Sequence, residues 1–224
     1  MLQIEWLVAS TLAFNGLLIG LLVWAYHAPR FAPYRMSQKQ SMRVSWTTRA
    51  RIMTTTSVLS LLTVFGVVRL AHDALILEGP TSVSMVLWDA LLVLLVYDFA
   101  YYFLHRLMHV KKLMRWVHGV HHRARNPSAL ESFYLHPVEL FAGLFLLFGC
   151  AYLVGPVHVY AFAVAFFVYS TLNILVHSGL DTGRKWLSPI DFLARKHHVH
   201  HQDDFSKNYS SLTPLPDLLF GTAK

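Results

Sequence analysis

The chain has 224 residues, of which 55% are hydrophobic and 14% are charged, and its formal net charge is +7. Soluble domains carry about 25% charged residues, so this composition excludes an ordinary soluble protein and indicates a membrane protein. The single cysteine, Cys150, excludes a disulfide framework and a cysteine-bound iron–sulfur cluster.

Five apolar runs come close to the roughly 20 residues that a helix needs to cross a bilayer. We predict spanning helices at 6–26, 52–70, 83–104, 138–154 and 157–176. The last two meet at Gly155-Pro156, which predicts a tight hairpin, and the short fourth run leaves a re-entrant hairpin as an alternative. The expected fold is an all-α integral membrane protein with four to five transmembrane helices and a cytoplasmic helical cap.

Positive charge is gathered between the apolar runs and acts as a topology signal. Six Lys or Arg residues lie in each of 30–51, 106–125 and 184–224, and only Arg69 lies elsewhere. The positive-inside rule places these segments and the C-terminus in the cytoplasm, as in a bacterial inner membrane or an ER membrane protein. Nucleic-acid binding would need a soluble basic face with aromatic neighbours, so we expect no nucleic-acid partner.

Histidines are concentrated on the same side of the membrane. Eleven of the fourteen lie in 105–136 and 177–201, and nine of these eleven fall in the patterns HRLMH, HGVHH and HHVHH. Helix residues three or four apart have Cβ atoms about 5–6 Å apart, so two such imidazoles can hold one metal ion. A doubled histidine adds a side chain about 100° round the helix, which can reach a second metal or a bridging position.

The alternatives for these histidines are pH sensing and ordinary interfacial polarity. Neither needs a repeated HxxHH spacing together with an HxxxH, so we favour a metal site. The remaining histidines lie at span ends, where we expect interfacial polar side chains: His27, His72 and His158.

The order of the boxes, with the last one following a helical hairpin, resembles the fatty acid hydroxylase/sterol desaturase superfamily of integral-membrane di-iron enzymes. The resemblance runs from about Asp98 to Thr222 and includes DFAYYFLHRLMH, LHPVE, NILVHSG and NYSSLTPLPDLLFGT. It implies that residues 1–82 form N-terminal transmembrane helices and residues 83–224 form the histidine-box catalytic region of a single membrane domain.

The resemblance also implies a ligand set for two iron ions, with O₂ as co-substrate and no catalytic residue beyond the metal ligands. The implied ligands are His105, His109, His118, His121, His122, His177, His197, His200 and His201. His136 is a tenth candidate, and its alternative is a helix-start histidine held by Glu139. His198 occupies a variable position and is left out of the set.

Five polar residues are candidates for contacts behind the ligands: Asp98, Tyr102, Asn173, Glu139 and Asp217. Asp98 precedes His105 by seven residues, about 10 Å along a helix, so any ligand that it orients belongs to another box. Its alternative is structural pairing with Tyr101, Tyr102 or another helix. Asn173 precedes His177 by one turn.

A shared site requires segment 178–204 to fold back against the mouth of the third and fifth spans. We expect His197, His200 and His201 to close the site as a lid, with His198 turned away. Residues 205–222 would hold the lid through Asn208, Tyr209 and Asp217. The nitrogens of His105, His121 and His200 should then lie within about 8 Å of one another.

The implied function is hydroxylation of a lipid C–H bond by a non-haem di-iron oxygenase in the membrane. The chain carries no GxGxxG site, so electrons would come from a separate ferredoxin, cytochrome or reductase. Desaturation and methyl oxidation are alternatives within the same superfamily. A membrane metal-binding or transport protein is an alternative of another class, and it would place its ligands along a path at mid-membrane.

Overall fold

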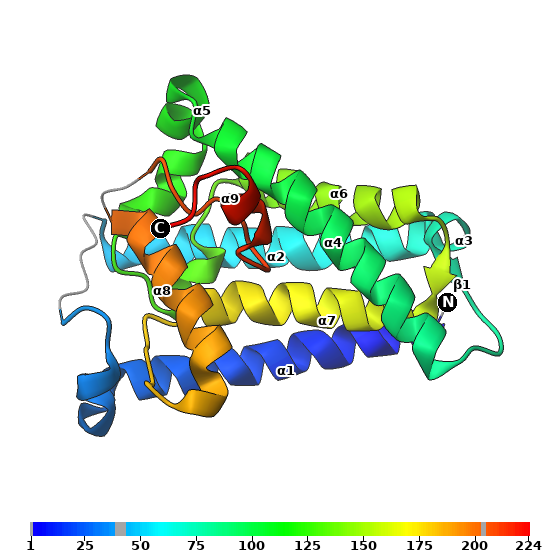
Figure 1. The fold of residues 1–224 in the computed structure, drawn as a ribbon, viewed down its shortest axis with the longest axis horizontal. Helices are drawn as coiled ribbons and strands as arrows, with labels where there is room; N and C mark the ends of the chain where they lie inside the picture. Colours follow the sequence, from blue (N-terminus) through cyan, green and yellow to red (C-terminus); the bar gives the residue numbers. More distant parts are fainter. Residues whose placement is uncertain (1, 39–43, 203–204) are drawn as a thin grey trace.

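Five long helices run along the length of the protein (Figure 1) in a computed structural model that describes residues 2–38, 44–202 and 205–224. They are α1 (Leu2–His27), α2 (Trp46–Leu70), α4 (Val83–Met108), α6 (Pro137–Val154) and α7 (Val159–Val176). Each is long and apolar enough to cross a membrane, so the predicted all-α, multi-pass membrane fold is confirmed. Helix α4 continues past the predicted end at residue 104, which makes His105 part of a rigid helix.

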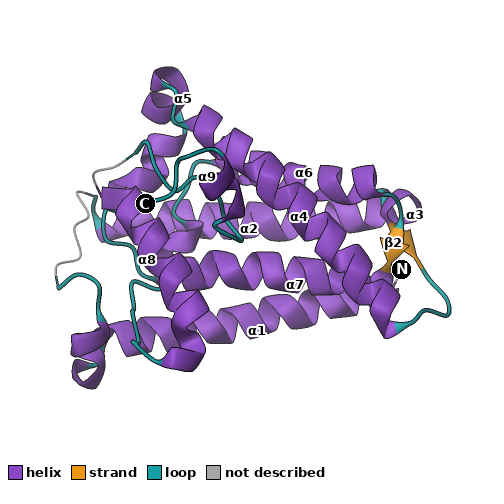
Figure 2. Ribbon diagram, in the orientation of Figure 1, coloured by secondary structure: helices purple, strands orange, loops and turns teal. Residues whose placement is uncertain are grey.

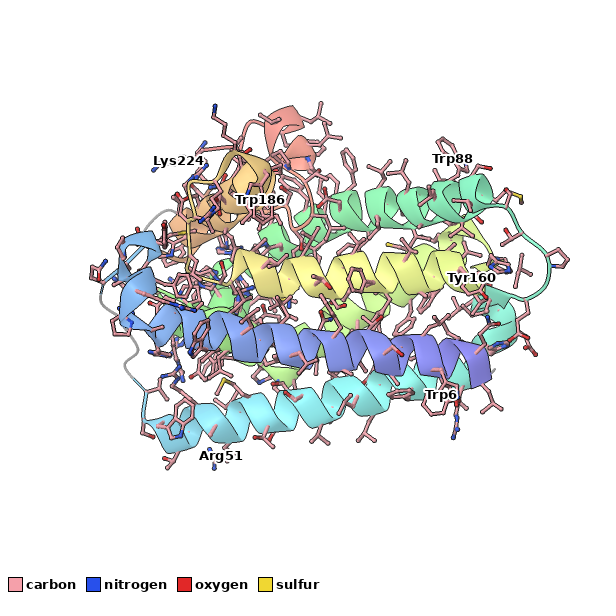
Figure 3. All side chains as sticks on the ribbon, turned by 90° about the horizontal axis from the view of Figure 1, so that it is seen from below. Trp6, Arg51, Trp88, Tyr160, Trp186 and Lys224 are labelled. Atoms are coloured by element: carbon pink, nitrogen blue, oxygen red, sulfur yellow. The ribbon has the colours of Figure 1, made fainter. Side chains whose placement is uncertain are left out.

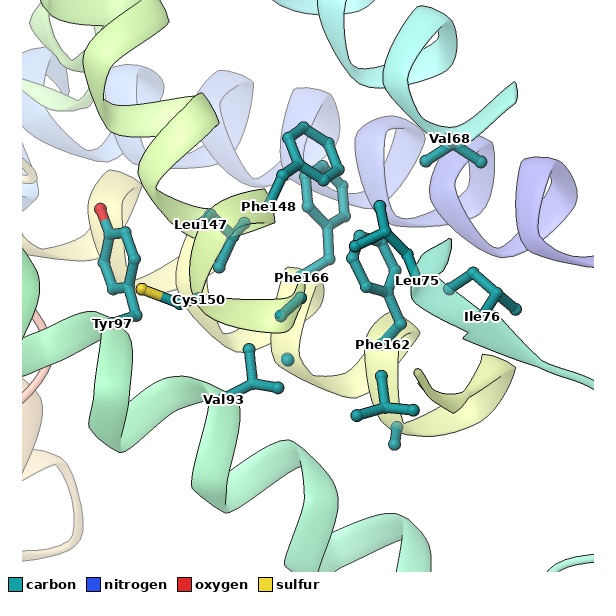
Figure 4. Close-up of a cluster of buried hydrophobic side chains, with 14 of the residues drawn as sticks. Val68, Leu75, Ile76, Val93, Tyr97, Leu147, Phe148, Cys150, Phe162 and Phe166 are labelled. Atoms are coloured by element: carbon teal, nitrogen blue, oxygen red, sulfur yellow. The ribbon is translucent and has the colours of Figure 1, made fainter. Parts of the chain in front are cut away.

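The five helices form a ring. Helix α7 packs between α1 and α4, and α6 packs between α4 and α2, whereas α1 and α2 scarcely touch each other. Inside the ring lies an apolar core in which Phe148, Phe162 and Phe166 stack beside Val93 and Tyr97 (Figure 4). The outer faces carry exposed aromatic and aliphatic side chains, including the labelled Trp6 and Trp88 in Figure 3, as expected for surfaces in contact with lipid.

One end of the ring is closed by the short helix α3 (His72–Leu75) and a small strand pair (Figure 2). Strand β1 (Ile76–Leu77) pairs in parallel with β2 (Val157–His158), a feature that the sequence did not predict because two residues carry no readable periodicity. The predicted hairpin turns here, with Gly155 at φ 107°, beside the start of α1. Helices α6 and α7 therefore reach the same end as the other spans, which favours a spanning hairpin over a re-entrant one.

The opposite end carries a cap of short helices. Its elements are η1 (Pro29–Tyr34), α5 (Lys111–Trp116), η2 (His118–Arg123), η3 (Ala129–Phe133), η4 (Lys185–Leu187), α8 (Ser188–Gln202) and α9 (Leu215–Leu219). Helix α8 packs against the end of α7, and α9 lies on α4 (Figure 1). This helical cap, which the sequence predicted, brings the histidine-bearing segments together.

Candidate metal centre

Nine histidines converge in the cap as two groups, and within each group the candidate ligand nitrogens lie within 4.8 Å of one another. The first group is His105, His109, His118, His122 and His200; the second is His121, His177, His197 and His201. These are the nine histidines that the sequence selects. His105 and His200 share a group and so lie well within the expected 8 Å, while metal binding itself remains a prediction.

Helix ends and helix faces deliver these side chains. His109 and His177 are the C-terminal caps of α4 and α7, so these two spanning helices end in the site. The doubled histidines each divide between the two groups: His121 and His122 separate, and so do His200 and His201. Neighbouring helical residues point in widely different directions, which is why one short box serves two groups.

The second box differs from the expected α-helix, because residues 118–123 form the 3₁₀ helix η2. Close packing at Gly119 accompanies this conformation: a Cβ there would overlap the carbonyl oxygen of Met114. Only glycine leaves room for η2 to turn tightly beneath α5. The glycine of the HGVHH box is therefore a structural requirement, and spacing alone did not reveal it.

Hydrogen bonds determine which ring nitrogen is available in most of these histidines. Backbone carbonyls accept the Nδ1 hydrogen of five rings: His105 (Tyr209, 2.7 Å), His121 (Tyr134, 3.1 Å), His177 (Asn173, 2.6 Å), His200 (Lys207, 2.7 Å) and His201 (Ala124, 2.9 Å). A carbonyl oxygen can only accept, so Nδ1 carries the proton in each case. The Nε2 atom of each neutral ring then carries a free lone pair, and imidazole binds a metal ion through this lone pair.

The Nε2 atoms face one another at distances that suit a cation bound between them. Nε2 of His105 lies 3.1 Å from that of His118, and Nε2 of His121 lies 3.2 Å from that of His177. Two bare lone pairs cannot share a hydrogen bond, and they repel unless a positive ion lies between them. Burial lowers the pKa of His118 and His177 to about 3, which disfavours protonation as the remedy. The residues present therefore fit a bound metal ion, and all-imidazole sites suit iron, zinc or copper.

The metal-free protein should lose stability in mild acid. Burial lowers the pKa of His118 to about 3, and burial together with the neighbouring His118 lowers that of His109 to about 3, whereas unfolded histidine titrates near 6.5. The unfolded chain therefore binds more protons, and each such group lowers the free energy of unfolding by up to about 1.4 kcal/mol per pH unit as pH falls from 6.5 towards 3. Unfolding of chelator-stripped protein, followed by tryptophan fluorescence from pH 7.5 to pH 4, measures this. A flat profile would contradict it, and metal-loaded protein should resist to lower pH.

Glu139 stands behind the first group. Its Oε1 accepts the Nδ1 hydrogen of His118 at 2.7 Å, while its buried Oε2 has no hydrogen-bond partner among the described residues. A carboxylate behind a metal-binding imidazole fixes the ring and raises its basicity. The tenth candidate, His136, caps the start of α6 by accepting from the backbone N–H of Val138 at 3.2 Å, and it lies outside both groups, which favours its alternative as a helix-start histidine.

Glu139→Gln should lower metal affinity by about 10–100-fold without unfolding the protein, since the amide keeps the size of the side chain but is a weaker acceptor. Competition with a chelator of known affinity measures the change. Glu78→Gln, in the loop at the other end of the ring, is the matched control and should leave metal affinity unaltered. Equal affinities for the Glu139 variant and the unaltered protein would show that this carboxylate does not support His118.

Two of the candidates for hydrogen-bonding to the ligands contact residues 205–222, the segment that follows α8. Asp98 accepts hydrogen bonds from the backbone N–H groups of Ser211, Leu212 and Thr213, at 3.2, 2.8 and 3.1 Å. Tyr102 stacks on Phe220, with ring centroids 4.9 Å apart. Within the described ranges neither side chain hydrogen-bonds to a grouped histidine, which favours the alternative of structural pairing for Asp98. Asp98, a costly carboxylate inside a span, has its partner in the chain that follows α8.

Asp217 reaches the first group through one intermediate residue. Its Oδ1 accepts the backbone N–H of Tyr209 at 2.8 Å, and the carbonyl of Tyr209 accepts from His105. Its Oδ2 lies 2.7 Å from Nζ of Lys196 on α8, so the same carboxylate binds the helix that carries the last box. Asn208 adds a 3.0 Å hydrogen bond from Nδ2 to the carbonyl of Lys196.

The predicted lid is confirmed in its geometry. Helix α8 folds back so that His197, His200 and His201 face the groups, while His198 turns away and contacts Gln202 at 2.8 Å. Asn173 contributes its carbonyl to His177, and its side chain lines the cavity described next.

A cavity of about 340 Å³ runs from the histidines into the ring of helices. Leu144 and Phe166 line its wall, together with Tyr97 and Tyr169. At the capped end its wall contains four of the grouped histidines: His105, His121, His177 and His197. Both groups therefore border a largely apolar chamber within the membrane-spanning part of the protein.

Residues 90–222, more than half of the chain, match the family model described as fatty acid hydroxylase. The chain belongs to the fatty acid hydroxylase family. Among curated relatives, methylsterol monooxygenase 1 of Rattus norvegicus is 34% identical over 130 residues, covering 56% of this chain and 43% of the relative. Very-long-chain aldehyde decarbonylase GL1-8 of Oryza sativa subsp. indica is 36% identical over 152 residues, covering 63% and 54%.

This member of the fatty acid hydroxylase family spans about half the length of the curated relatives it matches. No solved structure matches it. The family resemblance read from the histidine boxes is confirmed, and the matched region contains all nine grouped histidines, Glu139 and Asp217.

Proposed function

We propose that this protein is a membrane-bound non-haem di-iron oxygenase that hydroxylates a C–H bond of a lipid, using O₂ and electrons from a separate donor. The observation that carries the proposal is the placement of nine imidazoles, in groups of five and four, at the end of an apolar cavity inside a membrane bundle. The names of two relatives, a methylsterol monooxygenase and a very-long-chain aldehyde decarbonylase, support a lipid substrate.

Two groups of ligand nitrogens support two metal ions, one for each group. Iron bound there would supply the activation of O₂. The chain's own contribution is preorganisation: carbonyl groups and Glu139 hold the rings in the tautomer that presents Nε2. His200 and His201 are fully buried, so the cap also keeps bulk water from the reacting groups.

The cavity would hold the lipid with one stretch of its apolar body beside His105, His121, His177 and His197. Which hydrogen is removed depends on how far the lipid extends past them, because the ligands stay in place and the cavity shape positions the substrate. Desaturation and methyl oxidation are therefore the runner-up reactions, and the methylsterol monooxygenase relatives favour methyl oxidation between these two.

A metal-binding or transport protein is less consistent with the site. Transport would place ligands along a path through the bilayer. Here both groups lie at one end of the ring and beneath a cap that is bonded to α4 through Asp98.

We further propose that the capped end and the C-terminus face the cytoplasm, in a bacterial inner membrane or an ER membrane. Exposed basic residues gather at that end, as the positive-inside rule requires, among them Arg106, Lys111, Lys112, Arg115, Arg123 and Arg125. The same residues would attract an acidic electron donor such as a ferredoxin, cytochrome or reductase domain.

Lipid extracts from cells with and without the protein, compared by mass spectrometry, test the reaction. We expect a lipid that has gained one oxygen atom; loss of two hydrogens would indicate desaturation. Metal analysis of protein purified without chelator should give two metal ions per chain. A single metal, or none, would overturn the di-iron proposal, and lipid profiles unchanged in the presence of a matching electron donor would overturn the oxygenase.

A further inference from the structure

We infer that the lipid enters the cavity sideways from the bilayer, through the seam between α1 and α2. This inference rests on the proposed function for the identity of the cargo, and it deepens that function by assigning an entrance and the residues that control it.

This seam, the boundary between α1 and α2, is the least closely packed helix–helix boundary of the ring. Four of the five neighbouring helix pairs pack closely, and the pair α1 and α2 does not. Helix α1 is tied to α7 instead: Asn15 Nδ2 donates to Ser170 Oγ at 2.8 Å, and Thr171 Oγ1 donates to Asn15 Oδ1 at 2.9 Å. Figure 3 shows α1 and α2 drawing apart from the end with Trp6 towards the end with Arg51.

Both ends of the seam are closed, which confines the opening to its middle. Near the start of α1, Ile4 and Val8 are buried in the same apolar cluster as Val64 and Val68 of α2. Towards the cap, η3 packs against both helices, and its residues Ser132 and Phe133 line the cavity.

Residues in the middle of the seam line the cavity and are also exposed on the outside. Gly16 lines the cavity yet is exposed, and a Cβ placed on it would meet nothing within 4 Å. Across the seam, Leu61 lines the cavity and is 43% exposed, and Ser57 and Ser60 are half-buried. Residues that line the cavity and are also exposed mark the thinnest part of its wall, which is where we place the opening.

The entrance faces the apolar part of the membrane, because α1 and α2 are both spanning helices. An aliphatic body that enters here stays in apolar surroundings as far as the histidines, whereas a route through the cap would cross the buried Lys196–Asp217 pair and the segment bonded to Asp98. The occupant is thus the apolar body of a membrane lipid, either an acyl chain or a sterol.

Photo-crosslinking of the metal-loaded protein tests the entrance without requiring turnover. The probes are a diazirine-bearing palmitic acid and a diazirine-bearing sterol, each in phosphatidylcholine vesicles that contain the protein. The measured quantity is label on Leu144, Phe166 and Tyr97, which line the cavity and are almost wholly buried, so that only a molecule inside the ring can reach them.

The blocking variants are Gly16→Phe and Ser60→Phe, one on each side of the seam. Their controls are Leu17→Phe and Leu62→Phe, neighbours that are 77% and 66% exposed and do not line the cavity. We expect label on these internal residues to fall by at least about tenfold in the blocking variants, because the added phenylalanine ring fills the entrance and excludes the lipid probe. The label should persist in the controls. Unaltered metal content in all four would show that the site is intact.

Internal labelling that is equal in Gly16→Phe, Ser60→Phe and the controls would overturn the lateral entrance, and so would the absence of internal label from both probes. The probe that labels identifies the lipid class as acyl chain or sterol. Since no product is measured, loss of the oxygenase proposal would leave a positive crosslinking result standing, and the two failures can be told apart.

Discussion

His200→Ala is expected to abolish metal binding by the first group and activity together, while the protein still inserts into the membrane. His200 is fully buried, its Nε2 lies 3.2 Å from that of His109, and its ring centroid is 4.6 Å from that of His105. Removing it takes away one nitrogen from a group of five and leaves a cavity beneath the lid. The fall in activity should exceed the roughly 10–100-fold that loss of an outer contact causes.

Two histidine variants serve as controls for that experiment. His198→Ala alters the same helix, two residues earlier, at a side chain that turns away from both groups. His158→Ala removes a side chain from the far end of the ring, where its Nε2 donates to the carbonyl of Gly79 at 2.9 Å. Both should keep their metal. Damage from His158→Ala equal to that from His200→Ala would show that the site is not confined to the capped end.

Asp217→Ala should release helix α8, the lid, from the segment that follows it. The carboxylate is fully buried against the Lys196 ammonium group, and removal of one member of a buried ion pair costs about 3–5 kcal/mol. The backbone N–H groups of Tyr209 and Ser210 lose their acceptor as well. We expect a large fall in the midpoint of thermal unfolding and reduced metal content, because the carbonyl of Tyr209 that holds His105 is no longer fixed.

Asp181→Ala is the matched control, since it breaks an exposed pair with Arg195 (2.7 Å) that contributes less than about 1 kcal/mol. The double variant Lys196→Met with Asp217→Leu should recover much of the lost stability, because no unpaired charge is then buried. If Asp217→Ala unfolds at the same temperature as Asp181→Ala, the carboxylate does not hold the lid.

The pH behaviour of Asp217 is consistent with that role. Burial raises the pKa of this carboxyl, but the Lys196 ammonium and the hydrogen bonds from Ser210 outweigh burial and bring the pKa below the ordinary value. The folded pKa is therefore below the unfolded one near 3.9, and the stability that Asp217 contributes is present above that pH and is lost only in stronger acid. Mild acid should therefore affect the metal-free histidines before it weakens the lid.

The sequence predicted the parts of this protein that follow from composition and short spacing. Apolar length located the five spans, and the HxxxH and HxxHH boxes selected the nine histidines that meet in the cap. Both signals are local, since a bilayer sets the length of a span and a helical turn sets the separation of His105 and His109.

The rest depends on contacts between distant segments. Asp98 was considered as an aid to a ligand because it lies near a box in sequence, yet its partners are backbone groups more than a hundred residues later. His136 resembles a ligand in sequence, but Pro137 begins α6 directly after it and its ring caps that helix. Glu139 pairs with His118, twenty-one residues earlier in the chain, and not with His136, the neighbour that sequence spacing indicates.

The division of both HxxHH boxes between the two groups has a consequence for how the protein matures. The first group draws on α4, η2 and α8, and the second on η2, α7 and α8. Neither group is complete until α8, the last of these segments to be synthesised, has docked. A chain halted before His197 would therefore carry only part of each site. Completion of the ligand sets is thereby coupled to the docking of the last box-bearing segment.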